Sequence, residues 1–266
     1  MPDGGFERRL SFPLGLIAGV ASIALIVACT AGLTLYVGWY AAIAVGLVVL
    51  PALVFGFGLV RGSGAVVAAS VFGLAAAAIG SLELAEYREV SRGSVARDIA
   101  VEDVVHYPAA TVFYFRPAAV RIECEGRFLS RDSKGRTGTQ HYAAPIVSTG
   151  GPATPDVAAW AVCEEWGHCR DQWRKPFNAG IRKVRFTDDF AQAAARSAAK
   201  CGLRSLDGAA LVEWVERPEA RIQQHVDAFW DAVRIMTIAW LVVVVFAKAA
   251  WRLRKHVHER GQRATI

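Results

Sequence analysis

Charged residues are scarce in this sequence. They make up 20% of the 266 residues, while 54% are hydrophobic. Soluble domains have about 25% charged and about 45–50% apolar residues. Neither a disordered chain nor a collagen-like fibre has this composition. Because the surplus of apolar residues is gathered in long segments, an entirely soluble enzyme is excluded as well.

Motifs of known catalytic or cofactor sites are also missing. The sequence contains no G-x-S-x-G, no H-E-x-x-H and no glycine-rich phosphate-binding loop outside the apolar segments. The only candidate set of zinc ligands is His168 and Cys169 beside Cys163, and we expect these cysteines to form disulfides instead. We therefore expect no catalytic residue, no bound metal and no cofactor.

Four segments of about 20 residues are almost free of charge, and each is long enough to cross the roughly 30 Å hydrocarbon layer of a membrane as a helix. They are residues 12–36, 39–60, 65–84 and 233–250. No Asp, Glu, Lys, Arg or His lies near the middle of any of them, which argues against ion or proton transport. Small residues recur at every fourth position, as at Ala69 and Gly73. This spacing predicts close helix packing or self-association.

The basic residues predict the orientation of these spans. Arg8 and Arg9 precede the first span, Arg61 lies between the second and third, and several Lys and Arg residues follow the fourth. Because positively charged loops stay in the cytoplasm, both termini are expected there and residues 85–232 outside. The cytoplasmic segments hold nine Lys or Arg against three Asp or Glu, which accounts for the whole net charge of +6. Anionic lipid explains this charge, so we expect no nucleic-acid partner.

A rival interpretation treats the first span as a cleaved signal. The sequence Ile26-Val27-Ala28-Cys29 has the form of a bacterial lipoprotein processing site. Against cleavage, the apolar sequence continues through Leu35 into a second span. The location of residues 85–232 outside the cytoplasm is the same in both interpretations.

Four of the five cysteines lie in the external segment, namely Cys124, Cys163, Cys169 and Cys201. An even number of cysteines in a non-cytoplasmic segment predicts two disulfides. Three pairings are open, and we favour a local Cys163–Cys169 loop together with a long-range Cys124–Cys201 bond.

Periodicity and turn signals predict an α+β fold for the external segment. The expected strands are residues 111–115, 119–130, 137–147, 181–186 and 211–215. The expected helices are residues 154–167 and 188–200. A further helical face from Pro218 onward suggests that the fourth span continues outward as a stalk.

One external stretch combines aromatic and basic residues. We regard Trp166, Arg170, Trp173, Arg174 and Arg182 as a candidate surface for an acidic protein partner or a lipid headgroup, because tryptophan and arginine are enriched at binding hot spots. The alternative is a core tryptophan with solvated basic neighbours.

The expected fold is therefore an integral membrane protein with four transmembrane helices and a disulfide-stabilised α+β domain inserted between helices three and four. Residues 1–84 and 233–266 form the membrane and cytoplasmic parts. The abundance of arginine and alanine over lysine suggests a GC-rich bacterial source, which places the protein in the inner membrane and the domain in the periplasm.

The expected function is non-enzymatic. The domain would serve as a binding, sensing, assembly or immunity-type module whose partners are the lipid bilayer and a protein or a second copy of the chain. The alternative is a membrane thiol-disulfide oxidoreductase, a class that also combines four spans with external cysteine pairs. Its Cys-x-x-Cys motif is missing here, because five residues separate Cys163 from Cys169.

Overall fold

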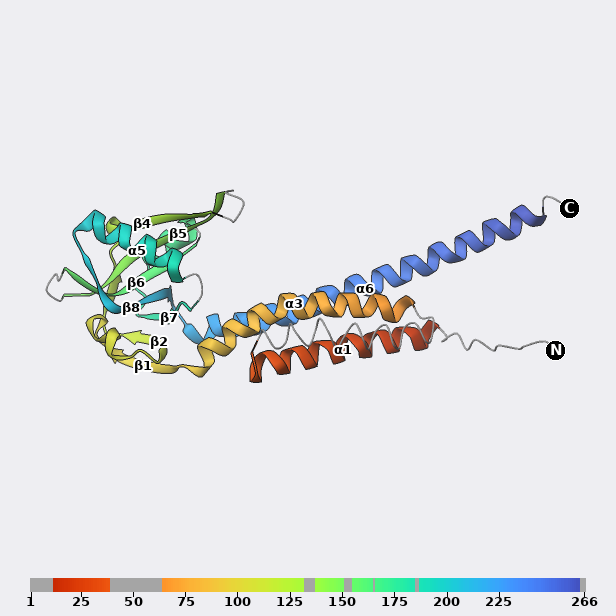
Figure 1. The fold of residues 1–266 in the computed structure, drawn as a ribbon, viewed down its shortest axis with the longest axis horizontal. Coiled ribbons are helices and arrows are strands. Elements are labelled where there is room, and N and C mark those ends of the chain that lie inside the picture. Colours follow the sequence, from red (N-terminus) through yellow and green to blue (C-terminus); the bar gives the residue numbers. More distant parts are fainter. Residues whose placement is uncertain are drawn as a thin grey trace. The chain divides into compact units, whose positions relative to one another are not determined.

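The computed structural model of the chain describes residues 12–38, 64–131, 137–150, 155–164, 166–184 and 187–263. The chain divides into two compact units. One contains Met1–Ala85 and His225–Ile266, and the other contains Glu86–Gln224. The first unit is helical, and the second is built around a β-sheet (Figure 1).

The helical unit contains long apolar helices. They are α1 (Phe12–Tyr36), most of α3 (Gly64–Arg92) and most of α6 (Pro218–Arg263). Each has a segment long and apolar enough to cross a membrane, namely Leu14–Tyr36, Val67–Arg92 and Pro218–Arg254. Three of the four predicted spans lie in these helices. The remaining one, residues 39–60, lies outside the described residues.

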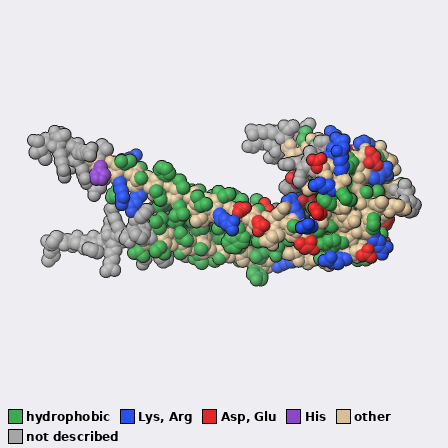
Figure 2. Space-filling model, turned by 180° about the vertical axis from the view of Figure 1, so that it is seen from behind, with side chains coloured by type: hydrophobic (Ala, Val, Ile, Leu, Met, Phe, Trp, Pro, Cys, Tyr) green, Lys and Arg blue, Asp and Glu red, His purple; other side chains and the backbone are tan. Residues whose placement is uncertain are grey.

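Large apolar side chains cover the outside of these helices. Ile17 is 66% exposed, Phe246 is 70% exposed and Leu253 is 66% exposed. In Figure 2, hydrophobic side chains cover the helices with few charged ones among them, whereas charged side chains are spread over the sheet unit. An apolar surface of this extent is unfavourable in water. The helices are therefore suited to association with a membrane.

Small residues let these helices pack closely. Gly73 of α3 lies against Ile23 and Ile26 of α1, and Gly19 of α1 lies against the indole of Trp240 of α6. A Cβ atom at Gly19 would overlap that ring. In the described helices, the recurring small residues therefore contribute to packing within the chain, as expected where lipid supplies no hydrophobic force between helices.

The sheet unit has eight strands in its described residues, and their order is β1-β2-β7-β8-β6-β5-β3 with β4 paired to β5. The strands are β1 (Ser94–Ile99), β2 (Ala110–Phe115), β3 (Ala118–Val120), β4 (Gly126–Arg131), β5 (Thr137–Ser148), β6 (Asp156–Cys163), β7 (Ala179–Arg182) and β8 (Arg204–Val215). Two pairs, β1 with β2 and β6 with β8, are parallel, and the other pairs are antiparallel. The sheet is therefore mixed.

Helices cover both faces of this sheet. On one face, α5 (Thr187–Cys201) packs its buried Phe190 and Ala193 against β5 and β6. On the other face, Trp173 of α4 (Trp166–Trp173) joins a core that contains Phe113 and Trp214. The domain thus has an apolar layer on each side of its sheet.

Strand β6 corrects the helix predicted at residues 154–167. Val157, Trp160 and Val162 point to the α5 side, whereas Ala159 and Ala161 join the core on the opposite face. A strand that is buried on both faces reads as a continuous apolar run, so its periodicity does not distinguish it from a buried helix. The Thr-Pro-Asp sequence before it resembles a helix start but leads into the strand.

The predicted strand at residues 119–130 is interrupted. The chain leaves β3 after Val120 and makes a 3-10 turn at Ile122–Cys124 before β4 begins at Gly126. This turn directs Cys124 towards the end of α5. Helix α5 itself begins at Thr187 with two acidic residues in its first turn and Lys200 in its last, as the helix dipole favours.

Candidate ligand-binding site

The aromatic and basic residues singled out in the sequence do not form one exposed surface. Trp173 is only 3% exposed and belongs to the core. Trp166 begins α4, but its side chain lies outside the described part. Arg170 and Arg174 are exposed on and just after α4, whereas Arg182 ends β7 and is half-buried.

Arg182 is held by the interior of the domain. Its Nε donates a hydrogen bond to the carbonyl oxygen of Ala110 at 2.7 Å, and its Nη2 donates to that of Tyr107 at 3.1 Å. The guanidinium carbon lies 5.1 Å from the centre of the Phe113 ring. Burial lowers the pKa of this guanidinium from its ordinary value, although it stays protonated. Arg182 therefore fixes the loop before β2 to the sheet.

Replacing Arg182 by alanine should therefore destabilise the domain by about 2–3 kcal/mol, because two carbonyl groups lose a charged donor. The matched change Arg174→Ala, at an exposed position, should change the free energy of unfolding by less than about 0.5 kcal/mol. Thermal unfolding of both variants measures the difference. Equal effects would show that Arg182 belongs to the surface after all.

The four external cysteines form two disulfides, Cys124–Cys201 and Cys163–Cys169. These are the pairings favoured in the sequence analysis. The first joins the turn before β4 to the end of α5, and the second joins β6 to α4. Cys124 and Cys169 are completely buried. Because Cys163 and Cys169 are bonded to each other, the proposed zinc ligands around His168 have no thiolate to offer.

Beside the second disulfide lies a cavity of about 320 Å³, within the sheet unit. It lies where the parallel strands β6 and β8 approach their carboxyl ends, an edge at which α/β sheets often bind ligands. The residues around it come from β6, α4, α5, β8 and α6 and from the positions directly after β6 and β7. They are Val162, Cys163, Glu164, Gln172, Lys183, Phe190, Glu213 and Arg221.

Two of the four charged residues around this cavity neutralise each other. Nε of Arg221 donates to Oε1 of Glu213 at 2.7 Å, and its Nη1 donates to Oε1 of Gln224 at 2.8 Å. Glu164 and Lys183 are half-buried. Among the described residues, neither of these two side chains has a hydrogen bond or an ion pair. The cavity therefore offers one carboxylate and one ammonium group to a ligand.

Sequence reasoning did not find this cavity. Its charged residues are Glu164, Lys183, Glu213 and Arg221, and they are separated by up to 57 positions along the chain. No short motif connects them. The only available signal was an isolated charged residue at the end of each of several apolar strands, which is a common pattern in sheets with no binding site.

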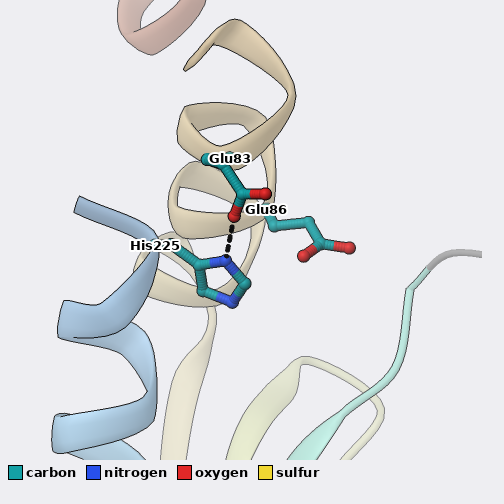
Figure 3. A group of neighbouring side chains, drawn as sticks. All are labelled: Glu83, Glu86 and His225. Atoms are coloured by element: carbon teal, nitrogen blue, oxygen red, sulfur yellow. Dashed lines mark hydrogen bonds and ion pairs between the residues drawn. The ribbon is translucent and has the colours of Figure 1, made fainter. Parts of the chain in front are cut away.

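A second polar group lies in the helical unit. Nδ1 of His225 on α6 is 2.8 Å from Oε2 of Glu83 on α3 (Figure 3). This hydrogen bond joins α3 to α6 within the helical unit.

No protein-family model matches this chain, and no curated protein or solved structure is significantly similar to it.

Proposed function

We propose that this chain is a multi-pass protein of the bacterial inner membrane whose periplasmic domain is a non-enzymatic binding module. The observation that carries the proposal is a domain with two disulfides, Cys124–Cys201 and Cys163–Cys169, between long apolar helices. Disulfides persist outside the reducing cytosol, and apolar helices with exposed Ile, Leu and Phe suit a lipid environment. The distribution of Lys and Arg supports cytoplasmic termini.

A binding role is supported by the connection between the domain and the last helix. Helix α6 begins at Pro218, and its first turns are tied to the sheet by Tyr114, which donates to Glu219, and by Arg221, which donates to Glu213. The same helix then continues without interruption through the apolar segment to Arg263. A ligand or protein bound to the domain could therefore act on a membrane helix directly.

The burial of Cys169 disfavours the oxidoreductase alternative. A thiol that exchanges disulfides must be accessible and stabilised as a thiolate. Cys169 has no exposed surface, and Cys163 is only partly exposed. We therefore assign both disulfides a structural role. The module would bind a protein partner, or a second copy of the chain through the small residues of its helices.

The location of the domain can be tested with reporters and thiol trapping. A reporter that requires export should be active when fused after Gly150, and a reporter that folds only in the cytosol should be active when fused after Ile266. In cells quenched with acid, one of the five cysteines, Cys29, should react with a maleimide before reduction and all five after reduction.

The opposite reporter pattern, or five reactive thiols before reduction, would contradict the proposal. A variant with Cys29→Ala serves as the control, since it should show no reactive thiol before reduction.

A further inference from the structure

We propose that the cavity beside the Cys163–Cys169 disulfide binds a small zwitterion, a free amino acid or a dipeptide, and this inference rests on the binding function proposed above. Lys183 would face the carboxylate of the ligand and Glu164 its ammonium group. Val162 and Phe190 back the cavity from the core with almost no exposed surface, so the ligand would be held by the charged groups.

The size of the cavity limits the ligand. Its volume is about 320 Å³, which is near the lower end of the range of about 300–1,000 Å³ for small-molecule sites. An amino acid or a dipeptide fits this volume, whereas a membrane lipid is too large to be enclosed.

The balance of charge indicates a zwitterion. The lining contains two acidic and two basic residues, so a simple anion or cation meets no net opposite charge. Glu213 and Arg221 pair with each other. The remaining carboxylate and ammonium, Glu164 and Lys183, are half-buried without such a pair in the described residues. Half-buried charges gain most from a partner that carries the opposite charge.

The cavity is also connected to a membrane helix. Arg221 belongs to the first turns of α6, so a ligand in the cavity contacts the helix that continues into the apolar segment. Occupancy of the site would hold the Glu213–Arg221 pair and the start of α6 in one arrangement. This connection makes the cavity suited to detecting a solute.

The binding test uses the full-length protein in lipid nanodiscs. Thermal unfolding is followed by tryptophan fluorescence with each of the twenty L-amino acids and with Ala-Ala at millimolar concentration. We expect at least one of these probes to raise the unfolding temperature by about 2 °C or more. Titration calorimetry then gives its Kd.

Charge-removing variants test the assigned roles. Lys183→Met and Glu164→Gln should each weaken binding of that probe by about 10-fold to 100-fold. The matched surface variants Lys175→Met and Glu216→Gln should leave the Kd within about twofold, because these residues do not line the cavity.

Blocked ligands test the same contacts without a change in the protein. The N-acetyl and the amide derivatives should bind the unchanged protein at least about 10-fold more weakly. The N-acetyl form should bind Glu164→Gln as well as it binds the unchanged protein, and the amide should bind Lys183→Met equally well. If a variant fails to fold, the blocked ligands still test the contacts assigned to Glu164 and Lys183 in the unchanged protein.

The inference is overturned if no probe changes the unfolding temperature, or if the variants and blocked ligands bind like their controls. Thiol counting in acid-quenched cells that express the same chain separates this result from failure of the proposed function. Intact disulfides without binding refute only the zwitterion site. Reduced cysteines in quenched cells refute the periplasmic module itself.

Discussion

Removing the Cys124–Cys201 disulfide with the double change Cys124→Ala and Cys201→Ala should lower the free energy of unfolding of the domain by about 4 kcal/mol. The two cysteines are 77 positions apart, and in the chain-entropy model a bond across a loop of this length strongly restricts the unfolded chain. Cys124 is completely buried, and its carbonyl accepts a hydrogen bond from Ser197 of α5. Because that carbonyl belongs to the main chain, the change removes the disulfide and leaves this hydrogen bond in place.

Thermal unfolding of the full-length chain, followed by near-ultraviolet circular dichroism, measures this loss. The matched change is Cys163→Ala with Cys169→Ala, which opens a loop with a separation of only 6 positions and should cost about 2 kcal/mol. Cys29→Ala, at an exposed free cysteine, should have no effect on the domain. Equal losses for the two disulfides would contradict the entropic explanation.

Trp160→Ala should destabilise the domain by about 4 kcal/mol, because it removes a large side chain from the middle of β6. Trp160 is 1% exposed and packs with Phe190 and Ala194 of α5. Its Nε1 donates a hydrogen bond to Oγ of Ser205 at 3.0 Å. The substitution therefore leaves a cavity between the sheet and α5 and removes the donor of that hydrogen bond.

Trp160→Phe separates these two contributions. It retains most of the packing and should cost about 1–2 kcal/mol. Leu129→Ala is the control, because Leu129 is partly exposed on β4, and it should cost about 0.5 kcal/mol. Chemical denaturation monitored by circular dichroism measures all three. If Trp160→Ala unfolds no more easily than Leu129→Ala, the assigned α5–sheet core is wrong.

The sequence predicted those helices that are determined by residues close together in the chain. Three apolar helices follow from segments without charge, and α5 follows from Asp188 and Asp189 at its start and Lys200 at its end. The local disulfide was favoured because Cys163 and Cys169 are close along the chain. In each of these cases the decisive residues lie within one segment.

Predictions from the sequence failed where a residue's burial depends on strands and helices that are distant in the chain. Strand β6 looked like a helix because α5 and the opposite core bury both of its faces. The sequence left Trp173 open between a partner surface and the core, and it did not show that Arg182 is half-buried, because partners such as Phe113 lie far away in the sequence. The charged cavity was missed for the same reason. Its residues meet only after the strands are placed in the order β7-β8-β6.

Helix α6 is longer than a membrane is thick. Its 46 residues correspond to about 69 Å at 1.5 Å per residue, more than twice the roughly 30 Å hydrocarbon thickness. Its only proline, Pro218, is at the first position, where it does not kink the rod. The helix is therefore long enough to cross a hydrocarbon layer and to extend well beyond it, with no proline after its first position to interrupt it.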